Sequence, residues 1–288
     1  MNQYVILTDS ACDISKELLD SWGVGFVPLT FKFTDSDIEY KNSDMPEEKF
    51  YSEMRAGRVA KTAAINVDTF IALFEKELEK GKDVLYIGFS SGLSSTFNAA
   101  RMAGGQLKER YPDKKIITID SLAASAGEGL LIYLTVQKKN EGASIEETAE
   151  YAKSLIPHIC HWFTVDDLVY LKRGGRVSAT AAFFGNALGI KPVMHVDDEG
   201  HLVPVSKVRG RRTSISAMAD MYTELAENPN DSCVFISHGD CISDAELLAK
   251  MIKDRHGVDV KIITSVGTVI GAHSGPGTLA LFFVGKHK

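Results

Sequence analysis

A run of hydroxyl side chains, residues 90–96, stands between a short apolar stretch and an expected helix. It reads Ser-Ser-Gly-Leu-Ser-Ser-Thr and follows the β-rich residues 84–87. Backbone N–H groups in the first turn of a helix lack intrahelical partners and the helix dipole is positive there, so such a junction binds anions. A carboxylate or a phosphate would fit. Hydroxyl groups also cap helices, and the segment alone favours neither interpretation.

The same loop contains the pattern of a hydrolase nucleophile elbow. Gly88, Ser90 and Gly92 match G-x-S-x-G between a strand and a helix. His238 and His273 lie downstream, so the chain order serine, acid, histidine is available. No HGGG-type segment precedes Ser90, and an elbow does not explain the further hydroxyls of the loop. A serine hydrolase that uses Ser90 is therefore the main alternative to anion binding.

Two further turns could present polar side chains. Residues 171–178 place two glycines between arginines, which suits a tight turn that presents a guanidinium. Arginine can hold a carboxylate or a phosphate through two parallel hydrogen bonds. Residues 273–278 place His273 in a turn with glycine and proline, where its ring can donate to an anion or bond another side chain. Taken alone, each segment is more simply interpreted as a solvated turn.

The elements that must position these loops alternate between strand and helix. Residues 4–7, 84–87 and 116–119 are β-rich, and each stretch leads through a small or polar loop into a helix with an apolar stripe. This alternation predicts a mostly parallel sheet covered by helices. Asn66 is expected to cap one helix, and Ser144–Glu147 and Ser243–Glu246 have the spacing of capping boxes.

The pattern changes near residue 165. A hairpin is expected with its turn at residues 198–200, and residues 233–264 regain a strand, helix, strand unit. The expected fold is therefore α/β with two domains. Residues 1–165 form the first, with a mostly parallel sheet and the anion-binding loops, and residues 166–288 form the second, of mixed α/β structure.

Composition and motifs exclude several classes of protein. The chain has 288 residues, is 44% hydrophobic and carries a formal net charge of -6, which suits a globular protein and not a nucleic-acid binder. There is no P-loop and no Cys/His metal spacing, and residues 127–129 read Gly-Glu-Gly without the third glycine of a dinucleotide fingerprint, so a glycine-tolerant helix is expected there. We expect neither a metal nor a cofactor.

Localisation follows from what the sequence lacks. The N-terminal residues do not have the basic flank and apolar core of a signal peptide. No uncharged apolar stretch reaches the roughly 18 residues that a transmembrane helix requires. The four cysteines form no CxxC pair and are expected to be free and mostly buried. A cytoplasmic protein without a transmembrane segment is therefore expected.

Taken together, seven segments resemble the DegV family across nearly the whole chain. Each is weak evidence alone, but the seven in order are specific. They are Thr8–Asp13, Lys61–Thr62, Ser90–Thr96, Asp166–Ser178, Ile190–Pro192, Lys207–Gly210 and His273–Gly277.

The resemblance implies a lipid-binding carrier, not an enzyme. It implies a two-domain fold that buries a long-chain fatty acid such as hexadecanoate between the domains, with Thr62 and Ser94 bonding the carboxylate. The side chains implied to support the head group are Ser91, Ser95, Arg176 and His273. The carrier would present its acid to a separate ATP-dependent fatty acid kinase, which forms an acyl phosphate for phospholipid synthesis. The basic loop Arg209–Arg212 is the expected docking site for that kinase.

The sequence departs from the family pattern at two places. The family often has Thr-Ser-Gln-Pro-Ser where residues 62–66 read Thr-Ala-Ala-Ile-Asn, and Ser-Gly-Thr where residues 94–96 read Ser-Ser-Thr. The first change removes hydroxyls and a proline beside Thr62. A third class of function, a protein-interaction module with incidental lipid, stays open beside the carrier and the hydrolase.

Overall fold

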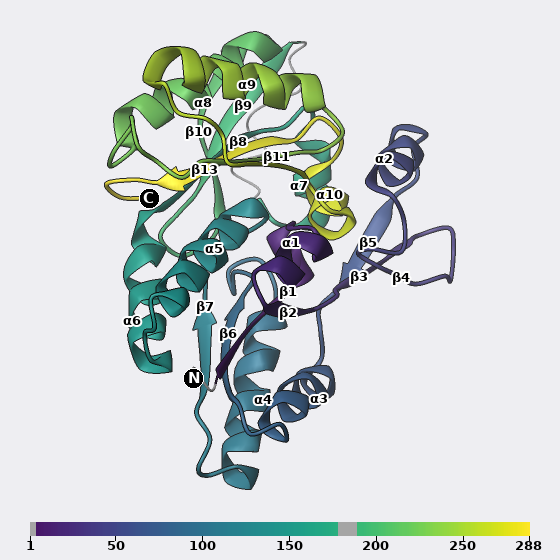
Figure 1. Cartoon of the computed structure of the whole chain (residues 1–288). Helices are drawn as coiled ribbons and strands as arrows, with labels where there is room; N and C mark the ends of the chain where they lie inside the picture. Colours follow the sequence, from purple (N-terminus) through teal and green to yellow (C-terminus); the bar gives the residue numbers. More distant parts are fainter. Residues whose placement is uncertain (1–3, 178–188) are drawn as a thin grey trace.

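Sheets form the frame of the molecule. The computed structural model describes residues 4–177 and 189–288 (Figure 1). The first sheet is parallel, with β2 (Val24–Val27), β1 (Tyr4–Asp9), β6 (Asp83–Gly88) and β7 (Ile116–Asp120) in spatial order. The second sheet is mixed, with the order β10 (Leu202–Arg209), β9 (Ile190–Val196), β8 (Ile159–Thr164), β13 (Leu279–Val284), β11 (Phe235–His238) and β12 (Ile262–Ser265).

Helices separate and cover these sheets (Figure 1). On one face of the first sheet lie α3 (Val67–Leu78) and α4 (Thr96–Arg110), and on its other face lie α1 (Lys16–Ser21), α5 (Ala126–Asn140) and α6 (Ile145–Leu155). The far face of the second sheet is covered by α8 (Arg211–Leu225) and α9 (Ile242–His256). Because α5 also contacts β8, β11 and β13, this one helix packs between the two sheets.

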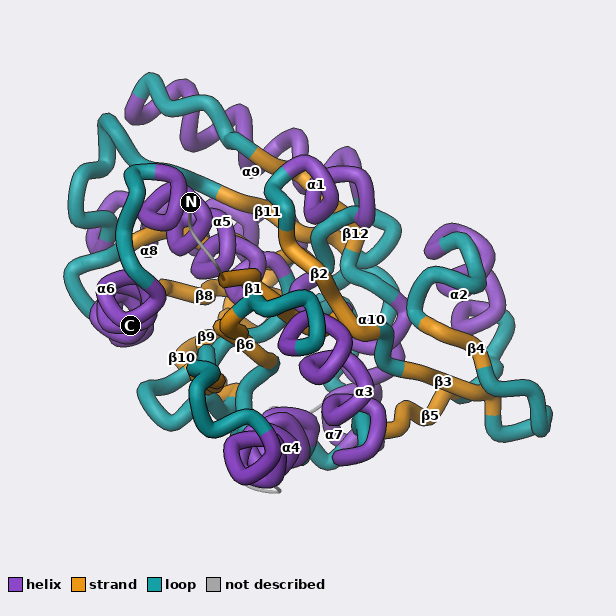
Figure 2. The backbone as a smooth tube through the Cα atoms, turned by 60° about the horizontal axis from the view of Figure 1, so that its bottom comes forward, coloured by secondary structure: helices purple, strands orange, loops and turns teal. Residues whose placement is uncertain are grey.

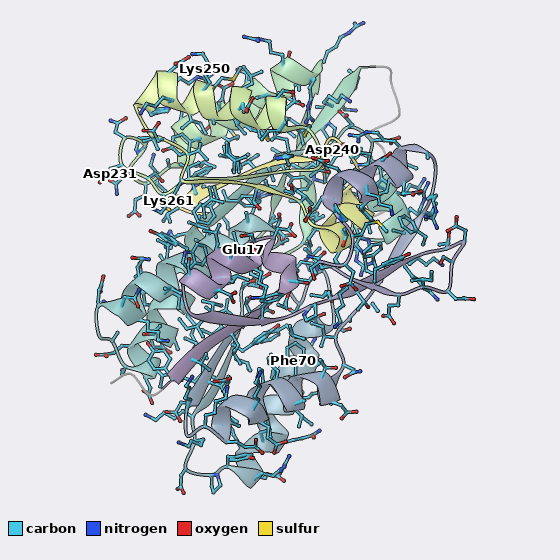
Figure 3. The ribbon with its side chains drawn as sticks, turned by 45° about the vertical axis from the view of Figure 1, so that its right-hand side comes forward. Glu17, Phe70, Asp231, Asp240, Lys250 and Lys261 are labelled. Atoms are coloured by element: carbon cyan, nitrogen blue, oxygen red, sulfur yellow. The ribbon has the colours of Figure 1, made fainter. Side chains whose placement is uncertain are left out.

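A smaller antiparallel sheet projects beside these layers, as Figure 2 shows. Its strands are β4 (Tyr40–Lys41), β3 (Thr30–Phe33) and β5 (Ala60–Ala63), and its aromatic core also contains residues of α2 (Glu47–Arg55) and α10 (Thr268–Ser274). Arg55 forms an ion pair with Asp240, which Figure 3 labels beside α2. Tyr51 donates to the carbonyl of Val266 over 2.8 Å. These contacts fix the small sheet against the second sheet.

Short helical elements complete the described chain. A 3-10 turn at Ser10–Cys12 follows β1, another at Ile156–His158 precedes β8, and α7 (Val169–Gly174) packs against α10. The segment Asp166–Ser178, one of the seven that resemble the DegV family, includes α7. Its last residue, Ser178, lies outside the described residues.

Two glycines at the start of α5 allow both sheets to approach it closely. A Cβ on Gly127 would overlap the ring of His161 and lie 2.8 Å from Cδ1 of Phe282, both on the second sheet. On the opposite side, a Cβ on Gly129 would lie 2.5 Å from Cγ1 of Ile14. The glycine-containing helix expected at residues 127–129 is thus confirmed, and its glycines are needed for close packing.

The predicted helix starts are confirmed at two places and wrong at a third. The Asn66 side chain accepts a hydrogen bond from the Thr69 amide (2.9 Å), and Ser144 and Glu147 form a reciprocal capping box. Ser243, however, lies inside α9, which starts at Ile242 without a side-chain cap. The chain leaves β11 through a tight turn in which Asp240 has a φ of 56°, so the helix begins earlier than the spacing indicated.

The expected α/β class is confirmed, with a parallel first sheet and a mixed second sheet. The predicted hairpin is also present, since Val196 pairs with Leu202. The division at residue 165 stays a prediction. Because β8 pairs with β9 and β13 of the second sheet, sheet membership favours a division before Ile159.

The structure also describes the cysteines, the helices that could span a membrane and the side chains that could bind a metal. The four cysteines are free, and Cys12 and Cys160 are buried. Within residues 4–177 and 189–288, no helix is long and apolar enough to cross a membrane. In the same residues, no group of three or more His, Cys, Asp and Glu side chains is arranged to hold a metal ion.

The contrast between the two capping sequences gives a matched test of the helix starts. Ser144→Ala removes a cap from α6 and should lower the free energy of unfolding by about 1 kcal/mol. Ser243→Ala, at an exposed position inside α9, should change it by less than about 0.5 kcal/mol. Urea unfolding followed by circular dichroism measures both, and equal losses would contradict the assigned start of α9.

Candidate functional site

A cavity lies between the two large sheets. Its wall is mostly apolar and includes Phe89 after β6, Phe163 on β8, and Ala280 and Phe282 on β13. Seven of the polar side chains on this wall fall into two groups. Thr62, Ser94, Ser95, Arg176 and His273 form the first group, and Ser125 and Ser237 belong to the second. The cavity therefore combines an apolar surface with sites for hydrogen bonds.

The first polar group is organised around a contact between Thr62 and His273. Thr62 is on β5 and His273 on α10, and Thr62 Oγ1 lies 2.8 Å from His273 Nε2. The other ring nitrogen, Nδ1, is buried without a hydrogen-bond partner beside Gly174. Burial and the nearby Arg176 charge lower the pKa of His273 to about 4, so its ring is neutral at pH 7.

Ser94 joins this group to the start of α4. Its Oγ accepts from the Thr96 amide (3.2 Å) and lies 2.9 Å from Thr96 Oγ1. Thr96 Oγ1 in turn accepts from the amide of Ile65 (3.4 Å), in the loop that follows Thr62. Ser94 therefore accepts from the first amide of α4 and also lines the cavity, so a role in starting the helix and a role in binding an anion are compatible.

The two neighbouring serines differ in position. Ser95 lines the cavity but makes no side-chain capping bond to α4. Ser91 is exposed and does not line the cavity, and its backbone amide donates to Asp120 (3.1 Å). The predicted head-group residues are thus brought to one cavity apart from Ser91, and their roles stay predictions.

Arg176 supplies the positive charge of the first polar group. Its Nε donates to the carbonyl of Leu93 (3.1 Å) and its Nη1 to that of Gly174 (2.6 Å). Among the residues that the structure describes, it has no carboxylate partner. Burial lowers the pKa of Arg176, but a guanidinium remains charged at neutral pH. A half-buried cation that has no carboxylate partner in the described part of the chain favours an anionic ligand.

A buried carboxyl group positions the loop that carries Ser94. Asp9 Oδ2 accepts from the Tyr86 hydroxyl (2.6 Å) and from the amide of Phe89 (3.1 Å). Its other oxygen accepts from the Ala11 amide (3.0 Å). Asp9 thereby ties the end of β1 to the end of β6, where the hydroxyl-rich loop begins.

Ser90 is placed differently from a hydrolase nucleophile. It is fully buried, and its hydroxyl donates to the carbonyl of Gly200 over 2.9 Å. It also accepts from the amide of Gly92 (3.1 Å). In the described part of the chain, His238 and His273 bond other groups and not Ser90. Ser90 therefore joins the β9–β10 hairpin to the loop after β6, and the geometry does not support the hydrolase alternative.

Sequence reasoning missed the second polar group. Ser125, before α5, donates to Asp13 Oδ2 (2.6 Å), and its Oγ lies 2.9 Å from Ser237 Oγ on β11. Ser125 and Asp13 both have positive φ values, 54° and 51°, which few residues other than glycine adopt. Asp13 belongs to a motif of the resemblance, but no spacing in the sequence links it to Ser125 or Ser237.

Burial controls the charge of the carboxyl groups near this second group. It raises the pKa of Asp13 to about 8. Burial, reinforced by the negative charge of Asp9, raises the pKa of Glu128 well above its usual range, and burial raises that of Asp9 too. Asp13 is therefore mostly protonated at pH 7, which leaves little negative charge from it beside the cavity.

The fold and the cavity define an α/β protein that can enclose an apolar ligand with an anionic end between two sheets. Residues 3–286 match the family described as "Uncharacterised protein, DegV family". The chain belongs to the DegV family.

Three similar proteins show how far the likeness extends. A DegV domain-containing protein of Clostridium perfringens is 39% identical over 100% of this chain and 99% of its own length. The solved structure of a stearic acid-binding protein of Eubacterium ventriosum has a TM-score of 0.89 and 28% identity, with 98% of each chain covered. That of a DegV lipid binding protein of Thermotoga maritima has a TM-score of 0.87 and 28% identity, with 100% of each chain covered.

The raised pKa of Asp13 predicts that ionisation of this side chain destabilises the folded protein as the pH rises. An asparagine does not ionise and would remove this loss of stability. An unfolded Asp13 ionises near pH 4 and the folded one near pH 8, so its effect is to lower stability as pH rises between these values. The free energy of unfolding of Asp13→Asn, relative to that of the wild type, should therefore rise by on the order of 2–5 kcal/mol between pH 4 and pH 8. Urea unfolding at both pH values measures this, and a pH-independent difference would contradict the protonated state.

Proposed function

We propose that the protein binds one long-chain fatty acid in this cavity, with its carboxylate at Thr62, Ser94 and Arg176. The observation that carries the proposal is a single cavity that joins an apolar wall to a half-buried guanidinium without a carboxylate partner among the described residues. The Eubacterium ventriosum and Thermotoga maritima proteins are described as stearic acid-binding and lipid binding. Their likeness over nearly the whole chain supports the same ligand class here.

The hydrocarbon tail supplies most of the affinity in this proposal. Burying about fourteen methylenes of hexadecanoate contributes roughly 11 kcal/mol, at about 0.8 kcal/mol each. Loss of translational and rotational freedom on binding costs roughly 4–15 kcal/mol, which is of the same order as this gain. The polar contacts then decide which end of the ligand lies at Arg176.

The contact between Thr62 and His273 suits a carboxylate. When the neutral ring carries its proton on Nε2, that nitrogen donates to Thr62 Oγ1, and the Thr62 hydroxyl is free to donate to the ligand. Ser94 Oγ accepts from a backbone amide, and when Thr96 Oγ1 donates to it, the Ser94 hydroxyl is free to donate to the ligand. His273 therefore acts as a positioning residue for Thr62.

We also propose that the protein presents the bound carboxylate to a separate ATP-dependent kinase. A carboxylate oxygen attacks the γ-phosphorus of ATP held by that partner, which gives an acyl phosphate and ADP. The absence of a P-loop from the sequence agrees with a nucleotide supplied by the partner. Arg209 and Arg212 are exposed near the start of α8, where Arg211 pairs with Asp244, and this loop is the proposed docking site.

Replacing Ser94 tests the head-group assignment. Ser94→Ala should weaken fatty acid binding only about two- to tenfold, because one hydrogen bond is lost, but should slow kinase-coupled acyl phosphate formation more strongly. Native mass spectrometry and a coupled kinase assay measure the two effects. Ser91→Ala is the matched control, since Ser91 is exposed outside the cavity. Unchanged turnover in Ser94→Ala would remove Ser94 from the mechanism.

The hydrolase alternative has a direct test. We expect a fluorophosphonate probe to leave Ser90 unlabelled, because its buried hydroxyl is bonded to Gly200. Intact-protein mass spectrometry detects the adduct, with Ser90→Ala as control. Stoichiometric labelling of the wild type alone would favour hydrolysis over carriage.

A further inference from the structure

Three residues of the cavity wall each carry a buried polar atom without a hydrogen-bond partner. In residues 4–177 and 189–288, seven buried side-chain nitrogen or oxygen atoms lack a partner. Three of these atoms belong to residues that line the cavity, namely His161, His273 and Ser274. A buried polar group without a partner destabilises the folded protein, so each of the three atoms is a candidate contact for a ligand.

Glycine backbone closes two of these three atoms to a ligand. A Cβ on Gly127 would overlap His161 Nε2, and a Cβ on Gly174 would overlap His273 Nδ1. There is thus no room even for a methyl group between each ring nitrogen and the glycine beside it. Of the three atoms, this leaves the hydroxyl oxygen of Ser274.

Helix α10 places Ser274 at the polar end of the cavity. Val269 and Ile270 line the cavity in the first turn of α10, and His273 and Ser274 line it one turn later. The wall that this helix forms therefore changes from apolar to polar at its end. Because His273 Nε2 contacts Thr62 and Ser274 is the next residue, Ser274 lies beside the first polar group.

The Ser274 hydroxyl is free to turn to a ligand. A serine near the end of a helix often bonds the carbonyl four residues back, here that of Ile270, but Ser274 Oγ makes no such bond. Rotation to another staggered position about the Cα–Cβ bond therefore breaks no hydrogen bond within the described part of the chain. Ser274 is 6% exposed, as is Ala280, another residue of the cavity wall, so low exposure is compatible with lining this space.

We propose that Ser274 is a third hydroxyl of the carboxylate site and donates a hydrogen bond to the bound fatty acid beside Thr62 and Ser94. A carboxylate only accepts hydrogen bonds, so the serine is the donor. The inference rests on the proposed fatty acid site and adds a binding residue to it. The carboxylate then satisfies a hydroxyl that is unpaired in the lipid-free protein, which the hydrocarbon end of the ligand cannot do.

Replacing Ser274 by alanine should affect stability and binding in opposite directions. In the lipid-free protein, Ser274→Ala removes an unsatisfied hydroxyl, so the free energy of unfolding should stay the same or rise. Hexadecanoate should bind roughly three- to tenfold more weakly, because one hydrogen bond is lost. Urea unfolding of delipidated protein measures the first effect, and displacement of a fluorescent fatty acid measures the second.

Thr164→Val is the matched control. Thr164 on β8 is fully buried, and its hydroxyl also lacks a partner among the described residues, but Thr164 does not line the cavity. Valine has nearly the same shape without the hydroxyl. The control should therefore keep or raise the stability of the lipid-free protein and leave the affinity for hexadecanoate unchanged.

Two results would overturn the inference. One is unchanged or tighter hexadecanoate binding by Ser274→Ala, which a serine facing the hydrocarbon tail would give, and the other is an equal loss of affinity in Thr164→Val. If Ser274→Ala does not fold, Ser274→Cys takes its place and should also bind more weakly, because a thiol is a weak donor. Failure of the wild-type protein to bind tetradecanoate, hexadecanoate and octadecanoate would instead overturn the proposed function.

Discussion

The packing of α5 between the two sheets is the constraint on which the rest of the structure depends. Gly127 admits His161 and Phe282 from one side, and Gly129 admits Ile14 from the other. A larger residue at either glycine would move one sheet away from the helix. The cavity lies near the start of this helix, where Ser125 joins the loop after β7 to the second sheet. Its width therefore follows from how closely the sheets approach α5.

The charge balance of the cavity follows from the same close packing. Burial keeps the ring of His273 neutral and keeps Asp13 mostly protonated at pH 7, whereas Arg176 retains its charge. The Arg176 guanidinium then supplies a positive charge to the wall of an apolar space, which favours a ligand with one anionic end. The side chains around it come from β5, from the loop before α4 and from α10, which are far apart in the sequence.

The sequence predicted elements well where the information was local, and poorly where it was not. The strand around Val84 and the cap at Asn66 were predictable because alternation and capping depend on neighbouring residues. The cap expected at Ser243 was wrong because the preceding turn started α9 earlier. The resemblance named Thr62 and His273, and the structure places them in contact. The contact between Ser125 and Ser237 was missed because it depends on tertiary packing that no spacing encodes.

The position of β13 has a consequence for synthesis of the protein. Every other strand of the second sheet precedes β13 in the chain, yet β13 lies between β8 and β11 near the middle of that sheet. On the ribosome, β8 and β11 emerge before the strand that joins them. Two cavity residues, Ala280 and Phe282, are on β13, so the wall of the cavity is complete only after β13 has been synthesised and inserted between β8 and β11. A chain that stopped before β13 would therefore lack this part of the cavity wall.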